Sequence, residues 1–296
     1  MLQELCIPAA VFLLQFYLTT TTMDLQDKNV IYIGGFGGIG QKCLHEFLTR
    51  RIKNLIIFDL IYNANLLNEL SKTFGSTNIE YIKLDLINER NIADAYEETF
   101  EKIGHFDVVI NGSGLMNDRL VNQTIQINLL GVIHSTLTAM KYMDKSVGGR
   151  GGLIVNISSV LGVEPNGFFG IYSASKCGVT GFTRALADPL HYKRTGIGFI
   201  TICPGFTDTS LLDMARGKET FDLPTPSTDR FSLMKHQTAA ECAKNLVKTV
   251  EMGKNGSVWM LDLGELKELH MPMVWKPTLK APICREEREK FNKNIK

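Results

Sequence analysis

The sequence lacks the features that would place it among metal-binding, nucleic-acid-binding or membrane-spanning proteins. Its six cysteines include no Cys-x-x-Cys pair, and no histidine stands at a spacing suited to zinc, so we expect no metal site and reduced, cytoplasmic thiols. The formal net charge of +1 provides no electrostatic reason to bind nucleic acid or an anionic membrane surface. Internal repeats and low-complexity linkers are also missing from the sequence.

Residues 1–22 form an apolar leader that is too short for a membrane span. Residues 7–18 are apolar but for one glutamine, and twelve residues cannot cross a bilayer as a helix. Secretion is disfavoured because no basic residue precedes this run, and because glycosylation sequons at Asn111 and Asn156 fall at predicted buried strand ends. The leader is therefore either a membrane-surface anchor, the one expected route to membrane contact, or an upstream extension of a chain whose functional start is Met23.

The remaining chain has the size and composition of one large α/β domain. With 296 residues, of which 44% are hydrophobic, it can bury a large core. We predict a single dinucleotide-binding domain over residues 23–265. Residues 266–296 are proline-rich and then charged, and are expected to form a loosely packed tail.

Short apolar runs alternate with longer amphipathic stretches from Asn29 onward. The short runs are rich in Ile and Val and nearly unbroken, which is typical of strands buried on both faces of a parallel sheet. The alternation predicts a doubly wound α/β fold with a seven-stranded, parallel, Rossmann-like sheet. The predicted strands cover residues 29–33, 54–58, 79–84, 107–110, 152–157, 198–203 and 257–261, and the predicted helices cover 38–50, 64–74, 89–103, 123–143, 172–192 and 239–251.

A glycine-rich loop, IGGFGGIG, directly follows the first predicted strand. Gly34, Gly38 and Gly40, with Ile39 between the last two, allow a tight turn and a close approach of a pyrophosphate to the next helix. Glycines also close ordinary strand–helix turns, but the second predicted strand is followed by Asp59. A carboxylate there can accept hydrogen bonds from both ribose hydroxyls and would repel a 2′-phosphate, so NAD is predicted in preference to NADP.

Further cofactor contacts are predicted at the ends of later strands. Asp85 ends the third strand and either meets the adenine amino group or caps the strand end. The segment NGSG, which includes Asn111 and Gly112, ends the fourth strand with small residues where a cofactor needs room. The segment PGFTDT, from Pro204 to Thr209, follows the sixth strand at the edge where open α/β sheets bind ligands. Thr209 either hydrogen-bonds a carboxamide or caps the following helix.

The stretch NISSVLGVEPNGFFGIYSASK contains the candidate catalytic groups. Tyr172 and Lys176 are four residues apart, so they lie on one helix face. A fixed cation favours the phenolate and shifts the phenol pKa from about 10 toward neutrality, as acid–base catalysis requires. Ser159, at the end of a strand, could hold a substrate oxygen beside the phenol. Such a Tyr–Lys pair by itself is also a frequent accident of a charged helix face.

Two further interpretations stay open. Asn128, inside a predicted helix, is either a solvated or bent turn or part of a proton path behind Lys176. Residues 206–234 are long enough to form a lid. The apolar side chains of this segment and of the catalytic stretch form either a pocket for a medium-sized secondary alcohol or ketone, or packing between lid and core; they are Leu161, Val163, Phe168, Phe169, Leu211, Leu212, Met214, Phe221, Leu223, Phe231 and Met234.

Taken in order, these motifs resemble the short-chain dehydrogenase/reductase family over residues 29–264. Within the family, DKNVIYIGGFGGIG and GSVWMLDLGEL are similar to insect-type alcohol dehydrogenases, and YSASKCGVTGFTRALA and ICPGF to NAD-dependent hydroxyprostaglandin dehydrogenases. The resemblance implies an NAD-dependent alcohol dehydrogenase whose catalytic tetrad is Ser159, Tyr172, Lys176 and Asn128. Ile33 and the NGSG segment depart from the usual pattern of the family.

The resemblance also implies a homodimer or homotetramer. Small residues on the helix from Tyr172 (Gly178, Gly181 and Ala185) are predicted to lie on its outer side, where a partner helix could approach. A different class of function is a non-catalytic NAD- or lipid-binding protein of the insect fat-body type that has kept the fold. The complete tetrad argues against this alternative, because an inactive site has no physical need to keep Tyr172 and Lys176 in register.

Overall fold

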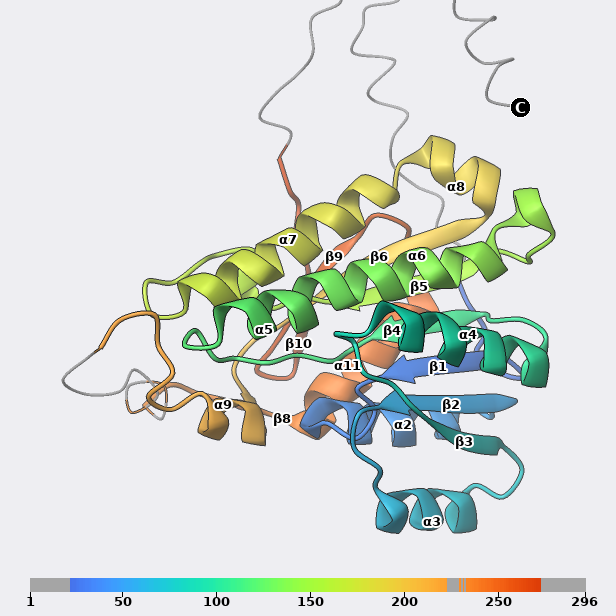
Figure 1. The fold of residues 1–296 in the computed structure, drawn as a ribbon, viewed down its shortest axis with the longest axis horizontal. Coiled ribbons are helices and arrows are strands. Elements are labelled where there is room, and N and C mark those ends of the chain that lie inside the picture. The colour runs from blue at the N-terminus through green and yellow to red at the C-terminus, as the bar shows by residue number, and fades with distance from the viewer. Residues whose placement is uncertain (1–21, 223–228, 230, 232, 273–296) are drawn as a thin grey trace, which may run out of the picture.

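The computed structural model describes residues 22–222, 229, 231 and 233–272, and these form a layered α/β structure (Figure 1). Its strands are β1 (Asn29–Ile33), β2 (Asn54–Asp59), β3 (Asn78–Lys83), β4 (Val108–Asn111), β5 (Gly152–Ile157), β6 (Ile197–Pro204), β7 (Thr207–Asp208), β8 (Gln237–Thr238), β9 (Val258–Asp262) and β10 (Glu265–Glu268). Its α-helices are α2 (Gly38–Thr49), α3 (Ala64–Thr73), α4 (Glu89–Ile103), α5 (Val121–Ile125), α6 (Gly131–Met143), α7 (Gly170–Leu186), α8 (Pro189–Thr195), α9 (Ser210–Met214) and α11 (Ala239–Met252).

The main sheet confirms the predicted doubly wound, Rossmann-like architecture. Its strand order is β10-β9-β6-β5-β4-β1-β2-β3, and β1 pairs in parallel with both β2 and β4. The chain therefore starts in the middle of the sheet, winds outward to β3, and returns to build the other half. Because parallel strands meet at one edge through their carboxyl ends, the loops after β1, β2, β4, β5 and β6 converge there.

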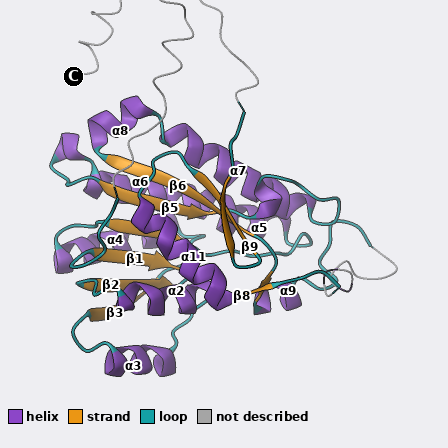
Figure 2. Ribbon diagram, turned by 180° about the vertical axis from the view of Figure 1, so that it is seen from behind, coloured by secondary structure: helices purple, strands orange, loops and turns teal. Residues whose placement is uncertain are grey.

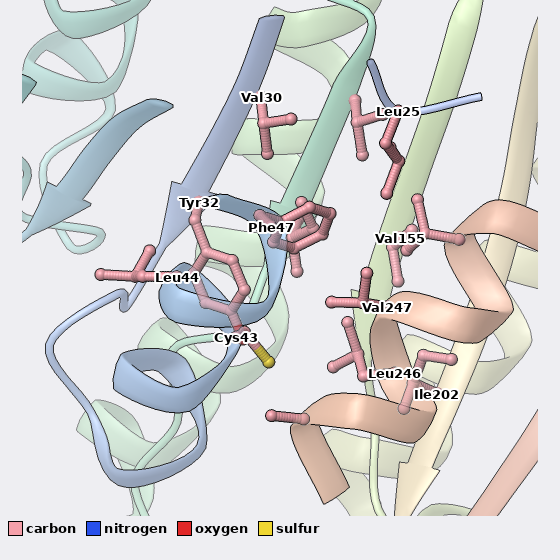
Figure 3. Packing of buried hydrophobic residues seen from close by; sticks show 14 of the residues in the cluster. Leu25, Val30, Tyr32, Cys43, Leu44, Phe47, Val155, Ile202, Leu246 and Val247 are labelled. Carbon is pink, nitrogen blue, oxygen red and sulfur yellow. The ribbon is translucent and has the colours of Figure 1, made fainter. Parts of the chain in front are cut away.

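Helices cover both faces of the sheet, which is why its strands are apolar without alternation. Figure 1 shows α4, α6 and α7 over one face, and Figure 2 shows α2 and α11 over the other. In β1, Val30 and Tyr32 pack with α2 and α11, while Ile31 and Ile33 pack with α4 and α6. Figure 3 shows the first of these cores, in which Tyr32 lies beside Phe47 of α2. Burial on both sides makes every position of such a strand hydrophobic.

An eighth, antiparallel strand extends the seven parallel strands that the sequence predicted. β10 pairs with β9 through a tight turn in which Leu263 and Gly264 have φ of 50° and 76°. Positive φ at both positions is the geometry that joins two strands with the natural twist. The strand escaped prediction because its sequence, ELKE, is polar: it lies at the sheet edge, with its side chains alternately exposed and half-buried.

Two predicted helices are interrupted. A turn of π-helix, η1 (Gln126–Leu130), separates α5 from α6 within the predicted helix 123–143. The predicted helix 172–192 is divided into α7 and α8, because Pro189 cannot continue a helix and instead begins a new one that Asp188 caps through the amide of Leu190.

The predicted domain limits stay predictions. Residues 1–21 and 273–296, which hold nearly all of the leader and most of the tail, lie outside the described residues. The segment predicted as tail starts within the sheet, since β10 includes residues 266–268. Within the part of the chain that the structure describes, no helix is both long and apolar enough to cross a membrane.

Candidate active site

The glycine-rich loop joins β1 to α2 at the carboxyl edge of the sheet. Gly34 has φ of 78° and donates its amide to the carbonyl oxygen of Phe58 at 2.7 Å, which directs the chain back over the sheet. α2 then begins after Gly37, which has no side chain to cap its first amides. Gly40 packs on the backbone of Gly34, and Ile39 packs on the core beneath α2. The loop therefore presents backbone N–H groups at a helix start, an arrangement that suits a pyrophosphate.

The carboxylate of Asp59 lies beside this loop. Its Oδ2 atom accepts a hydrogen bond from the amide of Phe36 at 2.9 Å, and its Oδ1 atom accepts from the amide of Ile61 at 3.2 Å. These contacts hold the side chain at the mouth of the glycine loop, the position that the predicted ribose contact requires. Leu60 and Ile61, which follow it, are exposed apolar residues.

Asp85 has a local hydrogen-bond partner, whereas Asn111 bonds to side chains of other elements. Asp85 accepts the amide of Ile87 on Oδ1 at 3.0 Å, as expected of a capped strand end, and its contact with adenine stays a prediction. Asn111 is buried, and its Nδ2 atom donates to Asn156 at 2.7 Å and to Thr136 at 3.1 Å. The side chain of Asn111 thus joins β4 to β5 and α6 inside the protein.

Close contacts between neighbouring loops involve Gly112 and Thr209. A Cβ atom at Gly112 would lie 2.9 Å from the ring of Tyr32, so this position has room for glycine alone. Thr209, after Pro204 at the end of β6, stands before α9, but within the described residues its hydroxyl makes no cap hydrogen bond. The capping alternative for Thr209 is therefore wrong. Its side chain instead lies against the start of α2, 2.6 Å from where a Cβ of Gly38 would be.

Ser159, Tyr172 and Lys176 are brought together at the end of β5. Ser159 follows the strand, and its Oγ accepts the amide of Leu161 at 3.1 Å. The Ser159 hydroxyl lies near enough to the Tyr172 phenol to lower its pKa. The preceding Ser158 points elsewhere, donating to the carbonyl oxygen of Lys176 at 2.9 Å. The structure thus separates the two serines and places Ser159 at the phenol.

The side chain of Lys176 extends from α7 to the end of β5. Its Nζ atom donates to the carbonyl oxygen of Ile157 at 2.9 Å and lies 5.8 Å from the centroid of the Tyr172 ring. The side chain is buried, with 3% of its surface exposed. Burial lowers the pKa of Lys176 to about 8, because the charged form loses its hydration.

The phenol of Tyr172 is also buried, and this reverses the predicted direction of its pKa. Burial raises the pKa of Tyr172 to about 12, against the lowering effect of the nearby Ser159 hydroxyl. The prediction that Lys176 moves the phenol toward neutrality is therefore wrong for the protein by itself. The Lys176 ammonium lies 5.8 Å from the ring centroid, and desolvation of the phenolate has the largest effect on the phenol pKa.

Asn128 lies in the π-helical turn and is fully buried. Its Nδ2 atom donates to the carbonyl oxygen of Leu115 at 2.7 Å and to the hydroxyl of Ser175 at 3.1 Å, and its Oδ1 atom accepts the amide of Leu115 at 2.7 Å. A Cβ atom at Gly114 would lie 3.5 Å from Nζ of Lys176 and 3.7 Å from Oδ1 of Asn128. The asparagine thus lies in a bent turn near Lys176, as one interpretation expected, and the proton path stays a prediction.

An apolar cluster surrounds Tyr172. It contains Leu161 and Phe169 from the catalytic stretch, with Leu211 and Leu212 of α9 packed against it. Of the remaining predicted apolar residues, Phe168 and Phe231 join the cluster, Met214, Phe221 and Met234 are exposed, Val163 is half-buried, and Leu223 lies outside the described residues. In this state the segment after β6 packs on the core beside the phenol.

Sequence reasoning missed one buried acid near the site. Asp118 accepts hydrogen bonds from the amides of Ile171 at 2.8 Å and Tyr172 at 2.9 Å, although it lies more than fifty positions earlier in the chain. Its polar neighbourhood in the sequence, NDR, resembles any exposed loop, so no local signal distinguishes it.

Comparisons with known proteins agree with this geometry. The sequence model of the short chain dehydrogenase family matches residues 28–220. The chain is 38% identical over 256 residues to alcohol dehydrogenase 1 of Ceratitis cosyra, covering 86% of this chain and all of that one. It is 35% identical over 252 residues to fat body protein 2 of Drosophila melanogaster, covering 85% of this chain and 98% of that protein.

A solved structure shows the same fold. The chain matches a short chain dehydrogenase/reductase from Burkholderia phymatum in complex with NAD with a TM-score of 0.68 and 18% sequence identity, over 81% of this chain and 89% of the other. The extent of the family match and the identity to insect alcohol dehydrogenases confirm the family that the motifs indicated. The chain belongs to the short-chain dehydrogenase/reductase family of oxidoreductases and is similar to its insect-type alcohol dehydrogenases.

Proposed function

We propose that this protein interconverts a medium-sized, apolar secondary alcohol and its ketone with NAD as the hydride carrier. The observation that carries the proposal is the proximity of the Ser159 hydroxyl and the buried Lys176 side chain to the Tyr172 phenol. A carbinol oxygen placed between the two hydroxyls would exchange its proton with Tyr172, and Ser159 would hold the oxygen. Tyr172 is then the base in oxidation and the acid in reduction.

The raised pKa of Tyr172 determines what the phenol needs in order to act as a base. A phenol whose pKa is raised to about 12 stays protonated at neutral pH, so the resting residue suits donation to a ketone oxygen. Its use as a base needs additional positive charge nearby. Lys176 supplies one cation, and its anchoring on Ile157 keeps it in place. Asn128, which lies near Lys176, would support a water path that carries the proton to solvent.

The glycine loop and Asp59 fit a dinucleotide. Gly34, Gly38 and Gly40 allow the backbone approach that a pyrophosphate needs, and the Asp59 carboxylate favours a free ribose 2′-hydroxyl. The solved relative from Burkholderia phymatum binds NAD, which supports the same group here. The bound nicotinamide would accept or donate the hydride; the protein supplies orientation and electrostatics.

Substrate, assembly and location complete the proposal. The apolar cluster at Tyr172 supports a hydrophobic substrate. The unpaired thiols of Cys43, Cys177, Cys203 and Cys242 support a cytoplasmic location.

We also propose that the protein forms a homodimer or homotetramer, but the contact face differs from the one that the sequence predicted. Gly178 faces Leu129 of its own chain, since a Cβ there would lie 2.8 Å from that side chain. Gly181 and Ala185 are exposed.

The second candidate is a non-catalytic protein that binds NAD or a lipid, and the similarity to fat body protein 2 favours it. One experiment separates the two. Purified protein is tested for NADH formation at 340 nm with short, fatty, retinoid, steroid and prostanoid alcohols, with NADP alongside. We expect turnover with an apolar secondary alcohol. Absence of turnover across the panel, with NAD still bound, would support the second candidate.

A pair of tyrosine variants tests the assignment of the acid–base group. Tyr172→Phe is expected to abolish turnover and to leave NAD affinity within about twofold, because the phenyl ring keeps the packing and loses the proton. Tyr192→Phe, on α8, is the matched control and is expected to keep full activity. Full activity in Tyr172→Phe would reject the proposed mechanism.

A further inference from the structure

The catalytic helix α7 begins without a cap of its own. An α-helix leaves its first N–H groups without intrahelical acceptors. A serine, threonine or aspartate at the N-cap position usually accepts one of them, but here this position is Phe169, whose side chain has no acceptor atom. Tyr172 lies in this first turn, so whatever holds these amides also sets the direction of the phenol.

Asp118 supplies the missing acceptor from a distant loop. Its Oδ2 atom accepts the amide of Ile171 at 2.8 Å, and its Oδ1 atom accepts the amide of Tyr172 at 2.9 Å. The residue is 4% exposed, so these hydrogen bonds are shielded from water. A carboxylate at a helix start also interacts favourably with the helix dipole. Asp118 lies in the loop between β4 and α5, which also holds Leu115, the residue bound by Asn128.

Thr220 connects the same turn to the segment after α9. Its hydroxyl donates to Oδ2 of Asp118 at 2.6 Å and accepts the amide of Gly170 at 2.8 Å. The amide of Asp118 in turn donates to the carbonyl oxygen of Lys218 at 2.8 Å. Just before this segment, Ala215 packs in the apolar cluster that contains Tyr172. The start of α7 is thus held by two segments that border the substrate side of the site.

We propose that Asp118 is a positioning residue for Tyr172, and that Thr220 links it to the segment 218–220. Asp118 orients the phenol through the backbone amides of the first turn and does not touch substrate or cofactor. Thr220 holds the carboxylate and completes the cap at Gly170. The inference rests on the proposed function, since it assigns Tyr172 as the group to be positioned.

Four variants test the link. Asp118→Ala is expected to lower kcat about 100-fold, the order of loss that follows a misplacement of about 1 Å, with the KM for NAD within about twofold. Asp118→Asn keeps one acceptor oxygen, so its kcat should lie between the values of wild type and Asp118→Ala. Thr220→Val keeps the shape but loses the hydroxyl, and should lower kcat about tenfold; Thr220→Ser restores the hydroxyl and should restore kcat. The serine rescue and the unchanged KM for NAD distinguish positioning from a general loss of structure.

The matched control is Asp222→Asn. Asp222 pairs with Arg119 at 2.6 Å and so joins the same two segments, but it is exposed and makes no hydrogen bond or ion pair with α7 among the described residues. Its kcat should stay within about twofold of wild type. Unchanged kcat in both Asp118→Ala and Thr220→Val, with the proteins folded, would overturn the proposal. So would an equal loss in Asp222→Asn.

A second measurement works without turnover. Amide hydrogen exchange at residues 170–172 should be about tenfold faster in Thr220→Val than in wild type and normal in Thr220→Ser, whether or not an alcohol is found. If the wild-type protein oxidises no alcohol but the threonine variants show these exchange changes, the proposed function is rejected and the link from Thr220 and Asp118 to α7 is kept. Unchanged exchange in Thr220→Val would by itself reject the link from Thr220 and Asp118 to α7. Should Asp118→Ala fail to fold, the two threonine variants decide.

Discussion

Asn128 binds both backbone groups of Leu115: its Oδ1 atom accepts the Leu115 amide and its Nδ2 atom donates to the Leu115 carbonyl oxygen, each at 2.7 Å. The contact joins the π-helical turn to the loop that follows β4. The extra residue in that turn rotates Asn128 inward, where a regular helix would distribute these positions differently. The Asn128 side chain therefore ties the bent turn to this loop and provides partners for both backbone groups of Leu115.

We predict that Asn128→Ala lowers the free energy of unfolding by about 3 kcal/mol. The change leaves a buried N–H and a buried C=O of Leu115 without partners, and each such group costs about 1–3 kcal/mol. Urea unfolding at neutral pH measures the effect. Asn122→Ala, at an exposed position of α5, is the control and should change stability by less than about 0.5 kcal/mol. Equal effects of the two substitutions would contradict the role assigned to Asn128.

The burial of Lys176 predicts a pH dependence of stability. Its pKa in the folded protein is about 8, below its ordinary value of 10.5, so between these values the unfolded chain binds more protons. Stability contributed by this residue therefore rises with pH in this window, by at most about 1.4 kcal/mol per unit, and is lost as the pH falls through 8.

Lys176→Met lacks this slope. Unfolding free energies measured from pH 7.5 to 9.5 should therefore rise more steeply for wild type than for the variant. The measurements stay below pH 10. Above that pH the unfolded chain loses the Tyr172 proton that the folded protein keeps, and stability falls in both proteins. Lys42→Met, at an exposed site on α2, should keep the wild-type slope. Parallel curves for wild type and Lys176→Met would show that the buried amine does not titrate as described.

Asp59→Asn is predicted to reduce the preference for NAD over NADP at least tenfold. The substitution removes the charge that repels a 2′-phosphate, and the amide oxygen still accepts the Phe36 amide. The ratio of kcat/KM values for the two cofactors measures the change. Asp85→Asn is the comparison, since its carboxylate ends the neighbouring strand; it should leave the ratio unchanged. An unaltered ratio in Asp59→Asn would remove this residue from cofactor selection.

The contact between Gly38 and Thr209 predicts a rescue. In Gly38→Ala the new methyl group would lie 2.6 Å from Cγ2 of Thr209, so the loop after β6 must move away from the glycine loop. NADH affinity, measured by fluorescence, should fall about tenfold. Thr209→Gly removes the side chain that would clash. In the Thr209→Gly background, Gly38→Ala should therefore lower NADH affinity much less than it does in the wild-type protein. Additive losses in the double variant would show that the two loops act independently.

Local patterns were sufficient for the seven parallel strands and for the motifs. Unbroken apolar runs indicate strands buried on both faces, and the seven parallel strands lie close to the predicted positions because each run carries its own periodicity. The spacing of Gly34, Gly38 and Gly40, and that of Tyr172 and Lys176, is likewise a property of one short segment. The order of these motifs along the chain was enough to indicate the family.

What only the tertiary structure decided depends on contacts between distant segments. The raised pKa of Tyr172 follows from how completely the surrounding chain buries it, and the cap of α7 comes from Asp118, far away in sequence. The inward turn at Asn128 depends on Leu115 in another loop. A sequence determines which side chains repeat on one face of a helix or strand, whereas desolvation and hydrogen-bond partners depend on which segments the complete fold places side by side.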